Sequence, residues 1–308
     1  MFTNQMSIDS KSPFLELNAL AALEHMRFST RQRIEGAFSG RHQSRQKGGS
    51  GEFTDYREYS DGEDLRRLDW KVMARTGKAY VRLFQDEKNL LCTLALDAST
   101  SMNFGAQSSS DLRGSKIEYA QYLATALSHV ICGGQDQVGL AILADRLQEY
   151  LLPGSTPGHV AHVQQLISEI QPVPETRMSG AMQQLFEQSK SRGVLMLMSD
   201  FLVEDLDELF AAVRLFRHRQ SEVIILHLIH PDEERLPAGT AYRFEGLENE
   251  GSVDCSPAEI QTIYQERFQA HTDSVRTSAL TNGCDYLRIS TAISYLQTLG
   301  EFLVERAG

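Results

Sequence analysis

The stretch that decides the fold is Leu90-Leu-Cys-Thr-Leu-Ala-Leu-Asp-Ala-Ser-Thr-Ser-Met102. Residues 90–96 are an apolar run with the length of a buried strand, and the run ends abruptly in Asp97. The hydroxyls of Ser99 and Ser101 follow at a spacing of two. If the run is a buried strand, these three polar side chains emerge together in the loop at its carboxyl end. In an open α/β sheet, that edge is where ligands bind.

The chain after this stretch alternates between apolar runs and amphipathic segments. The apolar runs predict strands over 90–96, 137–143, 146–152, 193–199, 222–229 and 284–289. The amphipathic segments predict helices over 115–131, 158–170, 180–190, 204–217, 257–280 and 293–306. Strands that alternate with helices indicate a Rossmann-like, mainly parallel sheet with helices on both faces. Residues 146–152 follow the preceding strand after a very short turn, which indicates an antiparallel edge strand.

Composition restricts the class of protein. The 308 residues are 41% hydrophobic and 23% charged, which is ordinary for a soluble globular protein. The net charge of -11 argues against non-specific binding of nucleic acid. No apolar stretch approaches the roughly 18 residues that span a bilayer, and the first residues lack the pattern of a signal peptide. Together with four widely spaced cysteines and no CxxC pair, these features lead us to expect a cytoplasmic protein.

Two further residues are candidates for the same edge of the sheet. Thr176 lies in a loop just before a predicted helix, and Asp200 follows the predicted strand 193–199. Carboxylate and hydroxyl oxygens suit the hard cations Mg²⁺ and Mn²⁺. The predicted metal ligands are Asp97, Ser99, Ser101, Thr176 and Asp200. Such a site leaves much of the cation's charge uncompensated, so it would attract a carboxylate from a partner.

Other interpretations of these residues stay open. Asp and Ser after a strand are also common as turn residues and helix caps. A metal-dependent phosphohydrolase could use the same site, but a haloacid-dehalogenase-like enzyme needs a second Asp where Ser99 stands. A serine hydrolase needs a Gly-x-Ser-x-Gly elbow, which is absent around Ser99 and Ser101. We therefore favour a non-enzymatic binding module, with the phosphohydrolase and a scaffold with a vestigial metal site as alternatives.

The metal pattern resembles that of a known domain. Asp97-Ala-Ser-Thr-Ser101, Thr176 and Asp200 look like the metal-ion-dependent adhesion site (MIDAS) of von Willebrand factor A (VWA) domains. The segments upstream resemble the signature of the family called domain of unknown function 58: Gly51-Glu-Phe53, Arg57-Glu-Tyr59, Asp61-Gly-Glu-Asp64, Arg66-Arg-Leu-Asp-Trp70 and Ala74-Arg75. The resemblance implies an N-terminal helix and signature block over residues 1–87 and a VWA-like domain over 88–308.

The resemblance also implies a partner. Members of that family are typically bacterial or archaeal and are associated with MoxR-type AAA+ ATPases. The chain would then be an adaptor or co-chaperone of such an ATPase, with a client protein as a possible third component. Many longer relatives carry membrane-spanning helices before the signature block, and this sequence shows none.

Three other features of the sequence carry weaker hypotheses. Residues 12–28 predict a helix. The basic stretch 27–47 has many acidic residues nearby in the sequence, which predicts internal salt bridges or a solvated face. The signature residues Arg57, Asp64, Arg66, Asp69 and Trp70 predict an ion-pair network that docks the block onto the VWA-like domain, with Trp70 as anchor. His227 and His230 precede three acids, which favours a strand end with a solvated acidic turn over a metal site.

Overall fold

The structure is a computed structural model. It describes residues 14, 23, 26–30, 52–60, 68–85, 89–105, 114–174, 177–239, 241–246 and 251–307. The chain divides into two compact units, residues 1–34 together with 90–308, and residues 35–89.

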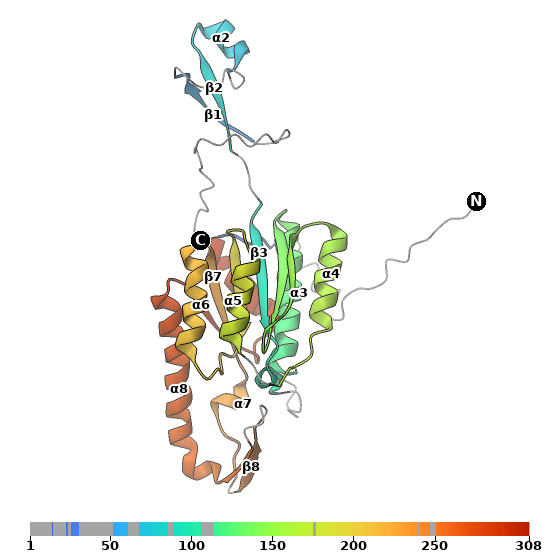
Figure 1. Cartoon of the computed structure of the whole chain (residues 1–308), viewed down its shortest axis with the longest axis vertical. Helices are drawn as coiled ribbons and strands as arrows, with labels where there is room; N and C mark the ends of the chain where they lie inside the picture. The colour runs from blue at the N-terminus through green and yellow to red at the C-terminus, as the bar shows by residue number, and fades with distance from the viewer. Residues whose placement is uncertain are drawn as a thin grey trace, which may run out of the picture. The chain divides into compact units, whose positions relative to one another are not determined.

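In the described residues of the larger unit, six strands form one sheet (Figure 1). They are β3 (Leu91–Asp97), β4 (Gln137–Leu143), β5 (Leu147–Gly154), β6 (Val194–Ser199), β7 (Glu222–Ile229) and β10 (Asp285–Ser290). Their order is β10-β7-β6-β3-β4-β5, and each neighbouring pair is parallel except β4 with β5, which is antiparallel. The predicted mainly parallel sheet with an antiparallel edge strand is confirmed.

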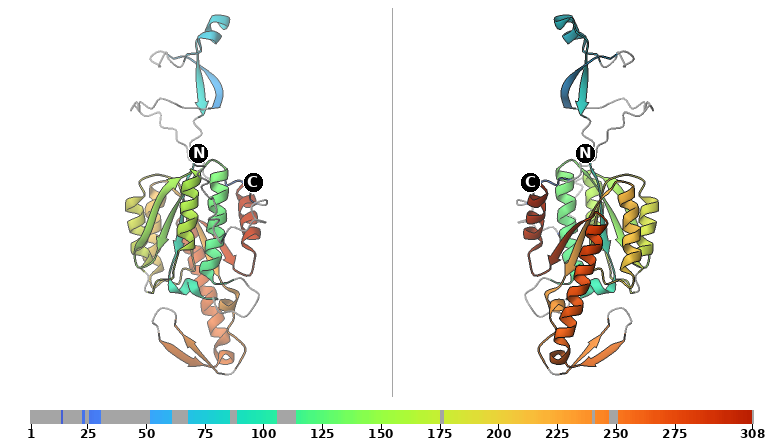
Figure 2. Two further views of the ribbon diagram at one scale, coloured as in Figure 1. Left: turned by 90° about the vertical axis from the view of Figure 1, so that its right-hand side faces the viewer. Right: turned by 90° about the vertical axis from the view of Figure 1, so that its left-hand side faces the viewer.

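Helices cover both faces of this sheet (Figure 2). One face carries α3 (Lys116–Gly133), α4 (Pro157–Ser168) and α9 (Tyr295–Ala307), and the other carries α5 (Met178–Gln188), α6 (Leu206–His218) and α8 (Pro257–Thr281). Each face has its own hydrophobic cluster, because alternate residues of a strand point to opposite faces. Leu94 and Leu96 belong to the first cluster, whereas Ala95 belongs to the second. The predicted fold class is therefore confirmed on both sides of the sheet.

The apolar character of the central strands follows from this arrangement. All residues of β6 and β7 are buried, since helices lie on both of their faces. Such strands read as continuous apolar runs rather than as alternating patterns. The edge strand β5 has no fully buried residue. From residue 90 onward, each predicted strand and helix begins and ends within about two residues of the observed element, which is the usual uncertainty of boundaries.

An insertion lies between β7 and α8. It contains the single turn α7 (Pro231–Glu234) and the antiparallel pair β8 (Tyr242–Glu245) and β9 (Ser252–Cys255). The sequence from Tyr242 to Leu247 predicts a short hairpin strand, and β8 confirms a strand there over Tyr242–Glu245. The hydroxyl of Tyr264 in α8 donates a hydrogen bond of 2.7 Å to the carbonyl oxygen of Glu233 in α7. The insertion is thus joined to the long helix that follows it.

The smaller unit contains β1 (Glu52–Glu58), β2 (Tyr80–Gln85) and α2 (Trp70–Thr76). β1 and β2 pair antiparallel, although the sequence there has no clear periodicity. Asp69 is buried and caps α2 by accepting hydrogen bonds from the backbone N–H groups of Lys71 and Val72. Trp70, however, is 61% exposed, and α2 buries no residue.

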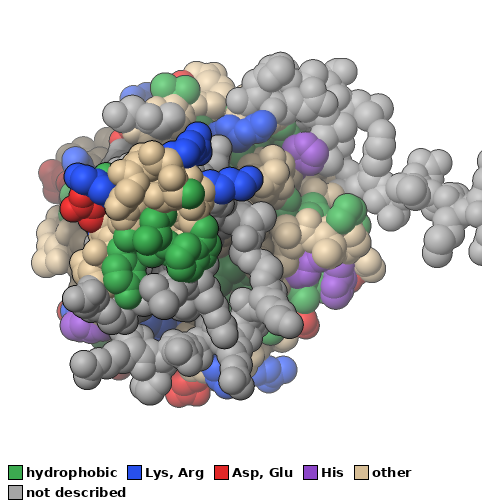
Figure 3. All heavy atoms as spheres, turned by 90° about the horizontal axis from the view of Figure 1, so that it is seen from above, with side chains coloured by type: hydrophobic (Ala, Val, Ile, Leu, Met, Phe, Trp, Pro, Cys, Tyr) green, Lys and Arg blue, Asp and Glu red, His purple; other side chains and the backbone are tan. Residues whose placement is uncertain are grey.

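The exposed face around α2 has a mixed character. Figure 3 shows hydrophobic side chains gathered beside Lys and Arg side chains on the face seen from above. Within the described residues of this unit, Tyr56, Trp70 and Met73 are exposed hydrophobic residues. The predicted docking of the signature block onto the VWA-like domain concerns two units that are described separately, and it stays a prediction. Asp64 and Arg66 lie outside the described residues.

The predicted N-terminal helix over 12–28 falls mostly outside the described residues. Residues 26–30 are described, and Phe28 stacks on Phe302 of α9 with 6.4 Å between ring centroids. The hydroxyl of Ser29 donates to the carbonyl of Arg306, whose Nε donates back to the carbonyl of Ser29. This short segment therefore belongs to the larger unit. Among the described residues, no helix combines the length and apolar character that crossing a bilayer requires.

Candidate functional site

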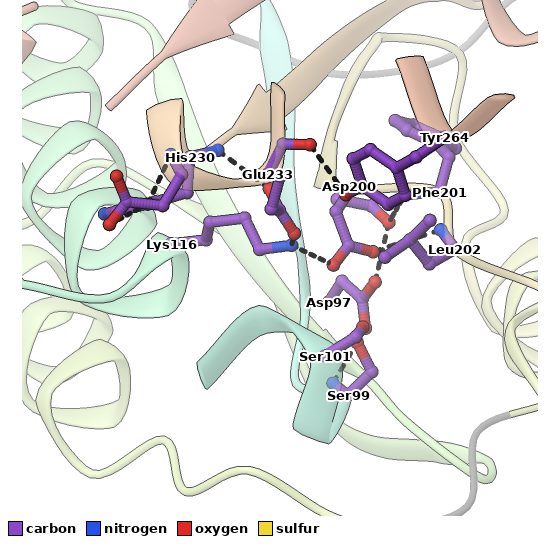
Figure 4. A network of polar contacts seen from close by, with 12 residues as sticks. Asp97, Ser99, Ser101, Lys116, Asp200, Phe201, Leu202, His230, Glu233 and Tyr264 are labelled. Atoms are coloured by element: carbon purple, nitrogen blue, oxygen red, sulfur yellow. Dashed lines mark hydrogen bonds and ion pairs between the residues drawn. The ribbon is translucent and has the colours of Figure 1, made fainter. Parts of the chain in front are cut away.

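The carboxyl ends of β3 and β6 bring four of the five predicted ligands together (Figure 4). Asp97 is the last residue of β3, and Asp200 directly follows β6, its parallel neighbour. Ser99 and Ser101 lie just beyond β3, where a short 3₁₀ helix spans Thr100–Asn103. All four side chains are buried, and Ser101 has the largest exposed fraction, 8%. The sequence prediction of a polar site at this edge is thus consistent with the geometry.

Asp97 is held by two donors. The hydroxyl of Ser199 donates to its Oδ2 at 2.6 Å, and the backbone N–H of Ser99 donates to its Oδ1 at 2.8 Å. Burial, together with the negative charge of Asp200, raises the pKa of Asp97 from 3.8 to about 7. The hydrogen bonds oppose this rise without cancelling it. A cation at this carboxylate would relieve the repulsion.

Ser99 and Ser101 present their hydroxyls as a pair. Their Oγ atoms lie 2.9 Å apart, and one hydroxyl donates to the other. Ligands that occupy neighbouring corners of an octahedron around Mg²⁺, at about 2.0–2.1 Å from the ion, are themselves about 2.9 Å apart. The spacing of the two hydroxyls therefore fits two neighbouring ligand positions of a hard divalent cation, as well as fitting a hydrogen bond.

A buried lysine that the sequence analysis missed also enters the site. Lys116 is the first residue of α3, and its side chain is fully buried. Its Nζ donates to Oδ2 of Asp200 at 2.6 Å and also to Oε1 of Glu233. Burial opposes the charge on Lys116, but the two carboxylates outweigh it and raise its pKa above the ordinary value. Lys116 is therefore an ammonium ion inside the cluster.

The same ion pair decides the state of Asp200. Burial alone would favour its neutral form, but the Lys116 ammonium holds the pKa of Asp200 below the ordinary value. The backbone N–H of Leu202 donates to its Oδ1 at 3.1 Å, and the hydroxyl of Ser101 donates to the same carboxylate. Asp200 is thus ionised and bonded on both oxygens.

Glu233 corrects one sequence interpretation. The prediction of a solvated acidic turn after His230 is wrong for this residue, because Glu233 is buried and paired with Lys116. Its Oε2 accepts a hydrogen bond of 2.8 Å from the backbone N–H of His230, which completes a capping box at the start of α7. Asp232 and Glu234 of the same turn are exposed as predicted, whereas Glu233 points into the site.

The residue after Asp200 has a strained backbone. Phe201 has a φ of 56°, in the left-handed region that a bulky residue rarely adopts. Its N–H donates to the Ser199 hydroxyl at 2.8 Å, and its ring is buried within 5.4 Å of the His227 ring. These contacts hold the strained turn in place. The turn then fixes the direction of the Asp200 side chain. Strain of this kind is concentrated at functional sites.

Thr176, the fifth predicted ligand, lies outside the described residues. The described residues nearest to it in the sequence are bonded to the strand ends of the site. The N–H of Val173 donates to the carbonyl of Ala98 at 2.8 Å, and the N–H of Arg177 donates to the carbonyl of Ala144 at 3.2 Å. Thr176 therefore stays a prediction as a ligand.

His227 and His230 are both buried. Nδ1 of His227 is 2.9 Å from the hydroxyl of Tyr286, and its ring lies 6.4 Å from that of His271. Burial lowers the pKa of His227 to about 3, so the ring is neutral at physiological pH. Among the residues that the structure describes, no group of three His, Cys, Asp or Glu side chains is placed to hold a metal ion. A metal site at the Asp97 edge would draw on the hydroxyls of Ser99 and Ser101 as well as on carboxylates.

The chemical type of these donor atoms fits a hard divalent cation. Two hydroxyls at neighbouring-ligand spacing stand beside two carboxylates, and oxygen donors of this type suit Mg²⁺ and Mn²⁺. When bound, such an ion would be held by Ser99 and Ser101, with Asp97 and Asp200 behind them. It would supply an open position for an oxygen ligand.

Comparison with known proteins places the chain in a family. The family model described as "Protein of unknown function DUF58" matches residues 55–276. The chain belongs to the DUF58 family. The resemblance predicted from its sequence motifs is confirmed. An uncharacterized protein of Mycobacterium tuberculosis is 26% identical to this DUF58 chain over 298 residues, which are 93% of this chain and 89% of the relative.

The solved structures that resemble this DUF58 protein share little sequence with it. One is an aerotolerance-related membrane protein from Bacteroides fragilis, 18% identical, with a TM-score of 0.47 over 70% of this chain and 98% of that one. Another is the VWA domain of SpRpn10, 13% identical, with a TM-score of 0.38 over 69% of this chain and 95% of that one. At TM-scores below 0.5, these likenesses carry no functional conclusion.

Proposed function

We propose that this DUF58 protein is a non-enzymatic protein-binding module that captures an acidic side chain of a partner through a divalent cation. Mg²⁺ or Mn²⁺ would be held by Ser99, Ser101 and Thr176, with Asp97 and Asp200 behind them. The observation that supports the proposal most is the convergence of two hydroxyls and two carboxylates at the carboxyl edge of the sheet. Ser101, the most exposed of the four, marks the side from which the partner would approach.

The leading partner candidate is a MoxR-type AAA+ ATPase, by resemblance to the family. The chain would act as an adaptor or co-chaperone between that ATPase and a client protein. His227 is bonded to the Tyr286 hydroxyl, and burial lowers the pKa of its ring to about 3, so it would be a weak general base for the hydroxyl pair. This supports binding rather than hydrolysis as the role of the site.

A pull-down tests the proposal. Purified chain is incubated with purified MoxR-type ATPase in Mg²⁺, with and without EDTA, and the experiment is repeated with Asp97→Ala. We expect capture in Mg²⁺ that is lost in EDTA and in the variant. The matched control is Asp207→Ala, which removes an exposed carboxylate from the first turn of α6 and should leave capture unchanged. Capture that is identical in all four conditions would sink the metal-bridge model.

One observation favours a second candidate, a scaffold whose metal site is vestigial. Lys116 already supplies a positive charge to Asp200, so the cluster is partly neutralised without a metal. This candidate predicts no rise in melting temperature with Mg²⁺. The metal-bridge proposal predicts a rise, because any ligand that binds only the folded state stabilises it.

A further inference from the structure

Lys116 occupies a costly position. Lysine is almost never fully buried unless it is paired, and burying its ammonium costs several kcal/mol before any pairing. Lys116 also stands at the first position of α3, where the positive end of the helix dipole disfavours a cation. At the first turn of a helix that begins at a sheet edge, a lysine side chain could extend into solvent. Instead, the carboxylates of Asp200 and Glu233 offset both the cost of burying the ammonium and the unfavourable helix dipole.

Lys116 is bonded to more acids than one ammonium neutralises. Asp200 and Glu233 are two buried carboxylates, and Lys116 is the one cation paired with them in the described part of the chain. Its ammonium also lies 5.7 Å from the ring centroid of Phe104, which adds a weak cation–π attraction. A further cation could therefore balance the remaining negative charge of the network. However, Oδ2 of Asp200 is already bonded to Lys116.

We propose that Lys116 is the resident cation of this site and competes with the divalent ion for Asp200. The inference rests on the proposed metal site and adds a regulation to it. Glu233 is the second partner that keeps the ammonium paired when Asp200 turns to the metal ion. The affinity for the divalent ion is therefore set by a residue that is not a ligand.

The competition between Lys116 and the divalent ion would also affect α7 and α8. Glu233 belongs to the capping box of α7, and its carbonyl accepts the hydroxyl of Tyr264 in α8. A stronger Lys116–Glu233 pair in the metal-bound state would tighten α7 over the site. Metal occupancy is in this way coupled to the insertion that carries β8 and β9.

The test uses a charge-conserving double variant, Lys116→Met with Glu233→Gln. It removes one positive and one negative charge and nearly conserves volume, so the buried network keeps its net charge. Mn²⁺ binding to the purified chain is titrated by electron paramagnetic resonance of the free ion. We expect the double variant to bind Mn²⁺ at least about tenfold more tightly than the unmodified chain, because Asp200 no longer holds an ammonium that the ion must displace.

A second buried ion pair supplies the matched control. Arg306 and Glu222 pair at the opposite edge of the sheet, and both are buried. Arg306→Met with Glu222→Gln makes the same chemical change there, and Mn²⁺ affinity should stay within about twofold of the unmodified chain. An increase in this control equal to that of the first variant would overturn the proposal.

The outcomes separate this inference from the proposed function. If the unmodified chain and the Lys116 variant bind Mn²⁺ equally, competition is overturned while the metal site stands. If only the variant binds, competition is supported and metal use by the unmodified chain is overturned. If neither binds, both are overturned.

A measurement on the unmodified chain covers the case in which the double variant does not fold. The ¹⁵N resonance of the Lys116 ammonium is followed by NMR during a titration with Mg²⁺. We expect it to shift with the same midpoint as the Mg²⁺-dependent rise in melting temperature. A resonance that stays unchanged at saturating Mg²⁺ would overturn the competition.

Discussion

The ammonium nitrogen of Lys116 lies 2.6 Å from Oδ2 of Asp200, although the two residues are 84 positions apart in the chain. This contact joins the beginning of α3 to the turn after β6, so the site is closed by a helix as well as by strand ends. It also means that the cluster carries one positive charge of its own.

Replacing the hydroxyl pair should abolish metal binding with little loss of stability. The double variant Ser99→Ala, Ser101→Ala removes two ligands but keeps the Ser99 backbone N–H that donates to Asp97. We expect a stability cost of about 1 kcal/mol for each lost hydrogen bond. In the unmodified chain, Mg²⁺ at 100 times its Kd should stabilise folding by about 2.7 kcal/mol. Differential scanning calorimetry should show this effect lost in the variant.

Ser128→Ala is the control for that experiment. Ser128 is a buried serine of α3 that donates to the carbonyl of Thr125, away from the strand ends. Its loss should cost a similar amount of stability while the stabilisation by Mg²⁺ persists. A Mg²⁺ effect that survives in the Ser99, Ser101 variant would place the metal elsewhere.

Asp97 should make the metal-free protein less stable as pH rises. Its pKa is about 7 in the folded chain, against 3.8 for its ordinary value, because of burial and the charge of Asp200. Between these two values the folded state binds a proton that the unfolded state has lost. The contribution of Asp97 is therefore fully present below pH 3.8 and is lost as pH rises through 7. Asp97→Asn removes this pH-dependent contribution to the free energy of unfolding.

Urea denaturation from pH 4 to pH 8 measures the effect. The free energy of unfolding of Asp97→Asn, minus that of the unmodified chain, should increase from pH 4 to about pH 7 and then level off. Taking the difference removes other groups that titrate in the same window. Ser128→Ala, which removes no titratable group, should give a constant difference. A constant difference for Asp97→Asn as well would show that its carboxyl ionises freely in the folded state.

His227 should stay neutral in the folded protein down to acid pH. Burial lowers its pKa to about 3, and its Nδ1 is paired with the Tyr286 hydroxyl. Since the unfolded chain protonates this ring near 6.5, stability contributed by the neutral ring is present above that value and is lost as pH falls through about 3. NMR of the imidazole ring should show no titration between pH 8 and pH 5. A midpoint near 6.5 would contradict the buried position.

Gly193 should tolerate no side chain. It precedes β6, and a Cβ at this position would overlap the carbonyl oxygen of Leu91 in β3. We expect Gly193→Ala to destabilise the fold by about 1–3 kcal/mol, the cost of overpacking. Gly158→Ala is the control, because no atom lies within 4 Å of its added methyl group and alanine favours the helix. Equal stabilities of the two variants, measured by urea denaturation, would argue against the close pairing of β3 and β6.

The sequence predicted the fold best where a single physical rule determines the residue pattern. Apolar runs between amphipathic segments locate β3, β6 and β7, because strands covered on both faces must be apolar throughout. The carboxyl ends of parallel strands share an edge, so Asp97 and Asp200 could be placed together from strand order alone. The hairpin of β1 and β2 could not be predicted, since its sequence mixes charges and aromatics without a period of two.

The missed residues of the site have no local signature. Lys116 looks like any charged residue at the start of an amphipathic helix, and its burial depends on Asp200 and Glu233 far along the chain. Glu233 stands among other acids after His230, where solvation is the ordinary expectation. Ser199 ends an apolar strand, and only the register of β6 beside β3 shows that its hydroxyl reaches Asp97. Such contacts require tertiary structure.

A crystal structure of the chain grown with Mn²⁺ tests the central claim most directly, because the anomalous signal locates the ion. The account predicts a peak between the hydroxyls of Ser99 and Ser101, at about 2.0–2.3 Å from each oxygen, with Asp97 and Asp200 behind it. It also predicts that the ammonium of Lys116 has moved from Asp200 toward Glu233. A saturating concentration of Mn²⁺ that leaves no peak there, with Lys116 still bonded to Asp200, would contradict the claim.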